Sequence, residues 1–428
     1  MNAAASISFA DGPAGDALLH VCAAPDADHG QIFAGLDPMA WDWLVKMASI
    51  QRAAPLLNRS LQIADARARV PSEASARLAA DARWHALYAL KQGAAIADTL
   101  RLLESEGFAP LVLKGAALAW RDYPEPVLRP LRDVDLLLTR DAAVAAQAFL
   151  LAHPSYRRAP WTVDYGPDHT HQLPEIQEIE RELTIEIHHR LNAKGWDQEH
   201  RLLAMMVQSP ATIDFLGVSA HTPSPHANFL HLVEHATLHH AFENGPLILS
   251  DLHYISKRHA LDWDRLRMDA EVMGLANGLR LIARLALRYG ACWVPADLAR
   301  EAQDAESHVM TARAVLLSEP EAVSRHAMLR RLSKGPGHLQ GWRGAIVRAF
   351  RPDRFQLAKI SGYGADDPMR WFGYPRWLAN RGIRFFKAQR RDAPEGIVQK
   401  QLAMANWLSI PGNSGKEAPN PHSQESSI

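Results

Sequence analysis

Two aspartates stand one residue apart inside an otherwise apolar run, in "LRPLRDVDLLLT". On a β-strand, residues i and i+2 share a face and lie roughly 6 to 7 Å apart, so Asp133 and Asp135 point the same way while Val134 points into the core. Two carboxylates held this close repel each other. A divalent cation such as Mg²⁺ removes that cost, because it takes carboxylate oxygens as ligands. The alternative for so short a pattern is the solvent-facing side of an edge strand.

A third carboxylate follows on a later predicted strand, in "ELTIEIHHRL". There Glu186 and His188 alternate with isoleucines, so Glu186 lies on the polar face of the strand. If this strand is the neighbour of the first, Glu186 joins the two aspartates. Three acids around two metal ions form the clamp that is used for in-line displacement at phosphorus.

A turn suited to anion binding precedes the aspartates, in "LVLKGAA". A short apolar strand ends at Lys114 and Gly115, and an Ala-rich helix begins near Ala116. Backbone N–H groups and the helix dipole attract an anion at such a turn, where Lys114 reaches a phosphate oxygen and Gly115 allows close backbone approach. Arg132 is a further candidate for phosphate contact and equally for a structural ion pair. Taken alone, the turn fits an ordinary strand-to-helix connection equally well.

The strands that carry these residues interrupt a chain with helical patterning. "MAWDWLVKMASIQRAAPLL" and "SARLAADARWHALYALKQGAAIADTLRLLESEG" space their apolar residues three and four apart, and Gly107 is placed to end the second run. Helical patterning returns from residue 195 to about 317. A strand-rich insert framed by helices predicts an α+β fold, in which residues 153–180 stay unassigned.

The patterns divide the chain into six segments. Residues 1–33 are rich in Ala, Gly and Asp without a clear period and predict a loose leader, while 401–428 predicts a disordered tail. Between them we expect a helical segment, a strand-rich core, a helical domain and a basic region, at residues 34–108, 109–194, 195–317 and 318–400.

Composition sets few limits on the partners. The 428 residues carry 47 Lys and Arg against 47 Asp and Glu, so net charge indicates neither a nucleic-acid nor a membrane partner. The two cysteines, Cys22 and Cys292, argue against a disulfide framework or a Cys-based zinc site and fit a reducing compartment. We find no secretory signal pattern and no apolar run near the 18 to 20 residues, roughly, that cross a bilayer. We therefore expect a cytoplasmic protein.

Residues 325–391 are locally basic, with sixteen Lys and Arg against three acids. Arginines are mixed with Trp and Phe in "MRWFGYPRWLANRGIRFFKAQRR", a composition that binds phosphates and stacks on bases. It equally suits an anionic membrane surface or the chain's own acidic remainder. We expect self-docking or contact with an anionic surface, and nucleic-acid binding is the less favoured alternative.

Three histidines recur every four residues in "HANFLHLVEHATLHH". On a regular helix His231, His235 and His239 form a stripe about 12 Å long, so two of them could bind zinc but all three cannot reach one ion. The order E-H also differs from the H-E-x-x-H motif of metalloproteases. We expect a polar stripe that lines a cleft beside the strands. His188 and His171 are closer in sequence to the acids and are candidate accessory residues of the site.

In this order the motifs resemble the uncharacterised nucleotidyltransferase family of the polymerase-β-type superfamily. "LVLKGAALAW", "YPEPVLRPLRDVDLLL" and "TIEIHHRL" match a strand that ends in a glycine turn, a D-x-D strand and a third acid on a later strand. The resemblance covers roughly residues 35–290. It implies a small polymerase-β-type α/β core embedded in a mainly helical protein.

The resemblance also implies site residues. It assigns metal-binding and catalytic roles to three acids: Asp133, Asp135 and Glu186. It assigns nucleotide binding to the turn glycine and two cations: Gly115, Lys114 and Arg132. His188 matches a further feature of the family. The superfamily usually has Gly-Gly or Gly-Ser at the turn, whereas Ala116 here removes a hydroxyl that often helps to hold the triphosphate.

The implied reaction moves a nucleoside monophosphate from an NTP to an acceptor, and pyrophosphate leaves. Mg²⁺ is the implied ion, with Mn²⁺ as the alternative, and Glu186 would orient or deprotonate an acceptor hydroxyl. The expected acceptor is a small molecule, a peptide or a protein. Two alternatives stay open: a catalytically silent nucleotide-binding or scaffold protein, and a D-x-D glycosyltransferase, which would need a larger Rossmann-like region before the motif.

Overall fold

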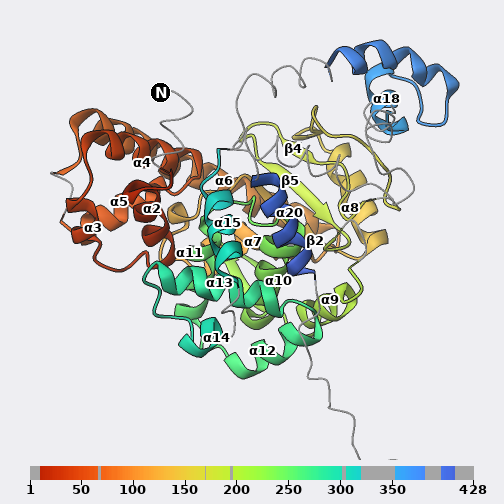
Figure 1. The fold of residues 1–428 in the computed structure, drawn as a ribbon. Coiled ribbons are helices and arrows are strands. Elements are labelled where there is room, and N and C mark those ends of the chain that lie inside the picture. Colours follow the sequence, from red (N-terminus) through yellow and green to blue (C-terminus); the bar gives the residue numbers. More distant parts are fainter. Residues whose placement is uncertain are drawn as a thin grey trace, which may run out of the picture.

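The strands form one mixed sheet of seven strands in the part of the chain that the structure describes (Figure 1). In the computed structural model their order is β3-β4-β5-β2-β1-β7-β6. The pairs β2–β5 and β1–β7 are parallel, and the other pairs are antiparallel. The strands are β1 (Leu111–Leu113), β2 (Asp133–Leu137), β3 (Tyr156–Arg158), β4 (Ile176–Glu178), β5 (Thr184–His188), β6 (Ala211–Phe215) and β7 (Val218–Thr222). The structure describes residues 10–65, 69–168, 170–192, 196–300, 305–319, 352–380 and 397–409.

The two faces of the sheet contact two different hydrophobic clusters. Val134 and Leu136 of β2 belong to the smaller cluster, whereas Leu137 belongs to the larger one. Because side chains alternate between the faces of a strand, Asp133 and Asp135 lie on the same face as Leu137. The two acids therefore point toward the larger cluster, which the helical part of the chain builds.

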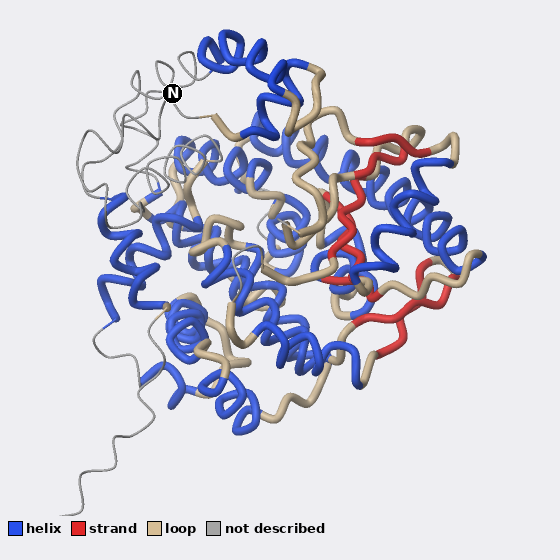
Figure 2. The backbone as a smooth tube through the Cα atoms, turned by 90° about the vertical axis from the view of Figure 1, so that its right-hand side faces the viewer, coloured by secondary structure: helices blue, strands red, loops and turns tan. Residues whose placement is uncertain are grey.

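Three helices supply the smaller cluster on the other face: α6 (Ser72–Ser105), α7 (Lys114–Arg121) and α8 (Arg140–Ala152). Buried alanines line α7 and α8, and alanine both favours the helix and lets it pack close to the strands. Figure 2 shows that the strands lie together on one side of the molecule.

The larger cluster is built by helices from both flanks of the sheet sequence. Figure 1 shows α2 to α5 on one side of the molecule and the strands on the other. The helices are α2 (Pro13–Ala23), α3 (Gly30–Ala34), α4 (Pro38–Ile50), α5 (Ala54–Ile63), α9 (Glu199–Gln208), α10 (Pro225–Glu234), α11 (Leu247–Arg258), α12 (Trp263–Val272), α13 (Ala276–Arg288), α14 (Ala296–Arg300), α15 (Glu306–Leu316) and α20 (Ile397–Leu408). A π-helix, η3 (His235–His239), directly continues α10. The mixed sheet and these helices confirm the predicted α+β fold.

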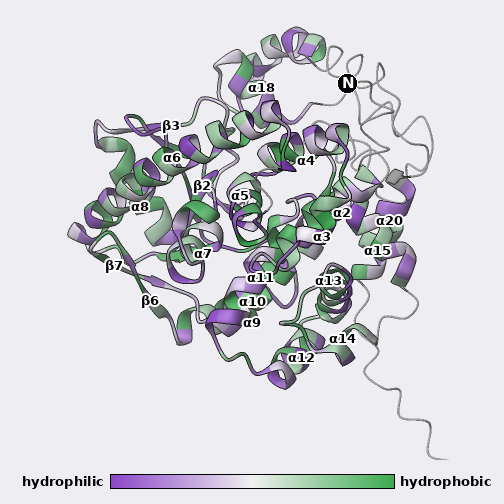
Figure 3. Cartoon of the chain, turned by 90° about the vertical axis from the view of Figure 1, so that its left-hand side faces the viewer, coloured by the Kyte–Doolittle hydropathy of each residue, from purple (hydrophilic) through white to green (hydrophobic). Residues whose placement is uncertain are grey.

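The prediction of a loose leader at residues 1–33 is wrong for α2, a mostly apolar helix (Figure 3). Leu18, Leu19 and Val21 are fully buried, and Asp16 pairs with Arg313 of α15 at 2.9 Å. A helix that is buried nearly all round shows no amphipathic period, which is why the pattern resembled an unstructured segment.

The predicted tail at 401–428 likewise begins inside a helix. Most of α20 lies beyond residue 400, and Met404 and Leu408 are buried in the larger cluster. The helix packs against α13 and α15. Apolar residues three and four apart indicate this helix, but the polar residues that follow it made the whole segment resemble a disordered tail.

A hairpin in the predicted helical domain extends the sheet beyond the expected core of 109–194. Strands β6 and β7 pair with Phe215 opposite Val218, which leaves a two-residue turn. Leu216 and Gly217 have φ values of 53° and 84°, as a hairpin turn with two left-handed residues requires. Because β7 pairs with β1, the core sheet reaches Thr222. Strands β3 and β4 occupy part of the unassigned segment 153–180.

The basic region at 318–400 is described only in part. Residues 352–380 contain α18 (Arg354–Ser361) and the 3₁₀-helix η5 (Pro368–Gly373), where the Trp371 and Phe372 rings are exposed. The rest of 325–391 lies outside the described residues, so its predicted surface role stays a prediction. Among the described helices, none has the length and apolar character that a membrane span requires.

Candidate active site

Strand register places two of the predicted acids side by side. The strand β2 is the fourth of seven, so the alternative of an edge strand is wrong. It runs parallel to β5, with Asp133 opposite Thr184 and Asp135 opposite Glu186. Neighbouring strands lie about 4.8 Å apart, so the carboxyl groups of Asp135 and Glu186 share one face at contact range. We call Asp133, Asp135 and Glu186 the acid cluster.

Lys114 binds directly to the acid cluster. Leu113 pairs with Asp135 across β1 and β2, so Lys114, the first residue of α7, begins beside that aspartate. The Lys114 Nζ donates to Asp135 Oδ1 at 2.8 Å. Burial alone would lower the pKa of Lys114, but the charge of Asp135 outweighs burial and raises it. The lysine is therefore a fixed cation, and its φ of 46° shows a strained backbone at this turn.

Gly115 lies in a closely packed position. A Cβ at this position would stand 3.1 Å from Leu131 Cδ2 and 3.6 Å from Arg129 Cζ. Arg129 is itself held by Asp251 of α11, with Nε to Oδ1 at 2.6 Å and Nη2 to Oδ2 at 3.0 Å. The glycine thus lets α7 pack closely on the loop that leads into β2.

His188 ties two of the acids together. Its Nε2 lies 2.8 Å from Asp135 Oδ1 and 3.3 Å from Glu186 Oε2. Ionised carboxylates only accept, so Nε2 donates to both. Burial, and then the charge of Lys114, would lower the pKa of His188, but its hydrogen bonds to the acids outweigh them and raise it. The ring fixes the spacing of the two carboxyl groups from a fully covered position.

The aspartates of the acid cluster differ in protonation. Burial raises the pKa of Asp133 to about 7, with further contributions from the charges of Asp135 and Glu186. Burial acts in the same direction on Asp135, but Lys114 and His188 outweigh it and hold that pKa well below its usual range.

Three ligand atoms around the acid cluster lie within 4.8 Å of one another, from Asp135, Glu186 and His188. Asp133 is outside this trio, so the structure groups two of the three predicted acids with a histidine.

His171 lies next to this site without touching the acids. Its ring centroid is 5.4 Å from that of His188, and its carbonyl oxygen accepts from the backbone N–H of His189 at 3.0 Å. Burial, followed by the charge of His188, lowers the pKa of His171 to about 3, so the ring is neutral. It packs behind His188.

An arginine that sequence analysis missed approaches the acid cluster from the loop between α4 and α5. Arg52 lies close enough to Asp133 to lower the pKa of that carboxyl. Burial, and then the nearby Arg132, lowers the pKa of Arg52 itself to about 10. The predicted Arg132 is exposed and makes no ion pair among the described residues. Arg52 is half-buried and has no local sequence signal, because it lies about eighty positions from the aspartates.

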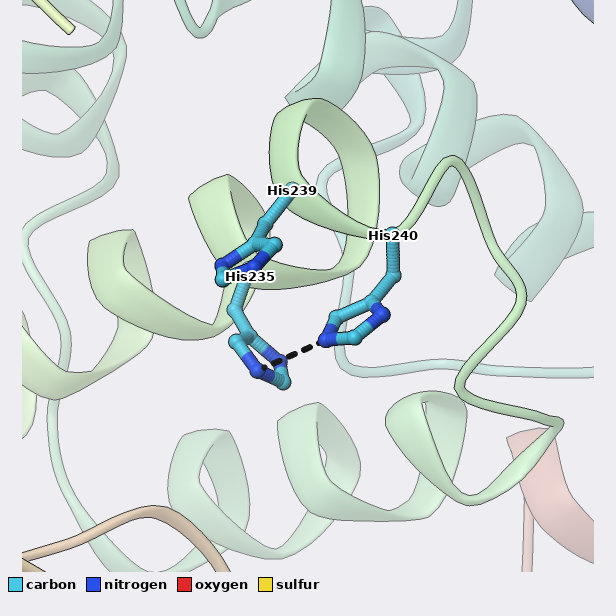
Figure 4. Close-up of side chains that lie close together, drawn as sticks. All are labelled: His235, His239 and His240. Atoms are coloured by element: carbon cyan, nitrogen blue, oxygen red, sulfur yellow. Dashed lines mark hydrogen bonds between the residues drawn. The ribbon is translucent and has the colours of Figure 1, made fainter. Parts of the chain in front are cut away.

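A second group of side chains lies on the π-helix. Ligand atoms of His235, His239 and His240 lie within 4.8 Å of one another, and we call these residues the histidine cluster (Figure 4). The sequence predicted a stripe of His231, His235 and His239, of which two could bind zinc. The structure keeps His235 with His239 and adds His240, whereas the ring centroid of His231 is 6.1 Å from that of His235. The prediction assumed regular helix geometry, which η3 does not have.

Glu234 is buried at the end of α10, directly before the histidine cluster. Asn192 Nδ2 donates to its Oε1 at 3.2 Å. Burial raises the pKa of Glu234 to about 7, although this hydrogen bond opposes the shift. The carboxyl group is thus half protonated near neutral pH.

Comparison with known proteins gives one finding. A family model described as uncharacterised nucleotidyltransferase matches residues 37–290, which hold both the acid cluster and the histidine cluster. No curated protein and no solved structure matches the chain.

Proposed function

The chain belongs to the uncharacterised nucleotidyltransferase family, and on that premise we propose that it transfers a nucleoside monophosphate from an NTP to an acceptor with the help of Mg²⁺. One observation carries the proposal. Asp135 lies opposite Glu186 in the strand register, and its carboxyl group is bound by Lys114 at 2.8 Å. The site therefore combines carboxylates that can bind a metal ion with a cation that can bind phosphate. The proposed acceptor is a small molecule, a peptide or a protein.

The donor set of the acid cluster fits Mg²⁺. The contacts of Lys114 and His188 use Oδ1 of Asp135 and Oε2 of Glu186, which leaves Asp135 Oδ2, Glu186 Oε1 and the Asp133 carboxyl as the proposed oxygen ligands. Burial, together with the negative charges of Asp135 and Glu186, raises the pKa of Asp133 to about 7. The three carboxyl groups therefore repel one another when all are ionised, and a bound cation would remove that repulsion. When bound, Mg²⁺ would neutralise phosphate charge, and Mn²⁺ is the alternative ion.

The proposed transfer is a displacement at the α-phosphorus. An acceptor oxygen forms a bond to the α-phosphorus, the bond from that atom to the bridging oxygen of the β-phosphate breaks, and pyrophosphate leaves. Glu186 takes the proton of the acceptor hydroxyl or orients it. Its side chain is 18% exposed, more than that of Asp135 at 5%, so it is the acid better placed to meet an acceptor.

The cations beside the acid cluster would position the triphosphate. An ammonium group has three N–H donors, and one of those on Lys114 goes to Asp135. The remaining donors are available to phosphate oxygens without loss of the ion pair. Arg52 carries a buried Nη1 that has no hydrogen-bond partner among the described residues, so a phosphate oxygen would satisfy it. We add Arg52 to the proposed nucleotide-binding residues and give exposed Arg132 a secondary place.

His188 acts as a positioning residue in this proposal. It donates to Asp135 and Glu186 at once, so it sets the distance between the proposed metal ligand and the proposed base. Its side chain is 2% exposed, which keeps it from the substrates.

The test is label transfer from each α-labelled NTP in the presence of Mg²⁺, with the protein alone and with cell extract. We expect transfer with pyrophosphate release, and none from the double variant Asp133→Asn, Asp135→Asn. The matched control is Asp141→Asn, because that side chain is 98% exposed. Label transfer that persists in the double variant would exclude these acids as the reaction centre.

One observation favours a second candidate, a catalytically silent nucleotide-binding protein. Lys114 Nζ already neutralises Asp135, as a metal ion would. The same experiment separates the two functions if nucleotide binding is measured by calorimetry beside it. Binding of an NTP without label transfer to any component of the extract would favour the silent protein.

A further inference from the structure

The histidine cluster brings three imidazoles together outside the acid cluster. His235 and His240 approach with their Nε2 atoms 3.2 Å apart, and a ligand atom of His239 lies within 4.8 Å of both (Figure 4). The ring of His239 stacks on that of His240, with centroids 4.6 Å apart. All three side chains are half-buried, so a ligand can reach them from solvent.

The π-helix is the reason that these three residues meet. The backbone N–H of His240 donates to the carbonyl oxygen of His235 at 3.1 Å, the i to i+5 bond of a π-helix. This bond places His240 one turn above His235, on the same side of the helix. In a regular α-helix, residues five apart point in clearly different directions around the helix axis. Single π-turns of this kind are frequent at functional sites.

The chain holds this turn at a conformational cost. The next two residues, Ala241 and Phe242, have φ values of 46° and 67°, which are rare for residues with a Cβ. Phe242 is fully buried, so packing fixes the strained end. The helix α13 packs against Thr237 of the π-helix. A Cβ at Gly278 of α13 would come within 2.7 Å of Thr237 Oγ1, so the glycine is what lets the two helices pack this closely. Strain that surrounding packing maintains is typical of ligand sites.

From this arrangement we propose that His235, His239 and His240 bind one Zn²⁺ ion, whose fourth ligand is water or an anion. Zn–N bonds of about 2.0 to 2.1 Å in a tetrahedron put two ligand nitrogens about 3.3 Å apart. The His235 and His240 nitrogens already have this separation, at 3.2 Å. Three protein ligands and one open position are also the arrangement of zinc sites that keep a place for a substrate or a water molecule.

Ligand chemistry separates this site from the acid cluster. Imidazole nitrogens suit zinc, whereas Mg²⁺ takes oxygen ligands. The two sites therefore favour different ions.

A row of rings connects the two sites. The ring centroids of His239 and His171 lie 5.3 Å apart, and those of His171 and His188 lie 5.4 Å apart. His188 donates to Asp135 and Glu186. A zinc ion on the π-helix would thus fix the helical segment that packs behind the acid cluster.

The first test is zinc binding by chelator-treated full-length protein, measured by calorimetry without nucleotide. We expect one Zn²⁺ per chain at micromolar concentration or below, and a loss of affinity of about 100-fold or more in the double variant His235→Gln, His240→Gln. His226→Gln is the matched control, since that histidine lies on α10 and pairs with Asp269 at 2.8 Å. Asp135→Asn is the second control, and both should retain zinc binding. Unchanged affinity in the double variant, or no zinc bound by the unmodified protein, would overturn the proposal.

A second test needs no variant. X-ray absorption of the zinc-loaded unmodified protein should show three imidazole nitrogens at about 2.0 to 2.1 Å and one further oxygen or nitrogen ligand. A coordination shell with sulfur, or with oxygens in the majority, would contradict the histidine site even if the variants do not fold. Because both tests omit nucleotide, they succeed or fail independently of the proposed transfer reaction.

Discussion

The acid cluster and the histidine cluster are both close groups of side chains, but different backbone features assemble them. Parallel pairing of β2 with β5 puts Asp135 beside Glu186, and antiparallel pairing with β1 adds Lys114. The histidine cluster depends on a departure from regular structure, because the π-helix brings His240 over His235.

The comparison teaches that regular periodicity makes a site visible in a sequence and irregular backbone conceals it. Strand alternation puts residues i and i+2 on one face, so a D-x-D pattern on an apolar strand predicts a shared location. Helical periodicity finds His235 and His239, which are four residues apart, but it separates residues five apart and so misses His240. The two clusters also differ in their donor atoms, which are carboxylate oxygens in the acid cluster and imidazole nitrogens in the histidine cluster.

The largest expected effect is on the transfer reaction. Asp135→Asn removes a proposed metal ligand and the partner of Lys114, so we expect kcat/KM for transfer to fall about 1,000-fold, because several kcal/mol of transition-state stabilisation are lost. Zinc binding at the histidine cluster should stay unchanged. Steady-state assays and calorimetry on one preparation check both. Equal loss of zinc binding and transfer would show that the clusters are one site.

Next in size is a pH-dependent effect on stability from Glu234, beside the histidine cluster. Its pKa is raised to about 7 from an ordinary 4.5, so the folded protein binds the proton more tightly than the unfolded chain. Stability from this group is fully present below pH 4.5 and is lost as the pH rises toward 7 and above, by up to about 3 kcal/mol.

The variant Glu234→Gln should therefore gain stability relative to the parent at pH 8 and not at pH 4.5. Urea unfolding at both values measures the difference. An equal shift at the two pH values would mean that folding does not raise the pKa of this carboxyl group.

A smaller effect concerns magnesium and Asp133. Burial and like charge raise the pKa of this carboxyl to about 7, and the proton must leave before the group binds a cation. Mg²⁺ affinity should thus rise about tenfold from pH 6 to pH 8, roughly half of that by pH 7, and level off above pH 8. In Asp133→Asn the remaining affinity should be flat over this range. A slope that the variant retains would assign the titration to another group.

The smallest expected effect comes from Arg52, at the edge of the acid cluster. Arg52→Gln should raise KM for the NTP about fivefold with little change in kcat, because a hydrogen bond to a charged group contributes about 1 kcal/mol or more. Arg77→Gln, a surface arginine paired with Asp42 at 3.0 Å, is the control. A fall in kcat at constant KM would place Arg52 at the reacting phosphate instead.

The sequence predicted the α+β class and the strands of the acid cluster because their signals are local and periodic. Glu186 was expected beside the aspartates only if its strand was the neighbour, and the register of β2 and β5 supplies that contact. The hairpin of β6 and β7 was missed although "ATIDFLGVSAHT" alternates apolar and polar residues, since the helical runs around it dominate the pattern.

Other features had no signal that a local pattern could carry. Packing of distant segments brings the charge of Arg52 near Asp133, and α2 is buried so completely that it lacks an amphipathic face. His240 follows His239 directly in the sequence, but only the π-helix brings its side chain to the same side as that of His235. Tertiary packing determines where Arg52, α2 and His240 lie, and the periodicity of the sequence contains no information about that packing.

The most direct test of the central claim is a crystal structure with Mn²⁺ and a non-hydrolysable NTP analogue, with anomalous scattering to locate the ion. We expect an anomalous peak within bonding distance of Asp135 and Glu186, with the triphosphate beside Lys114 and Arg52. A nucleotide bound elsewhere, or an acid cluster that binds no ion while nucleotide is present, would contradict it.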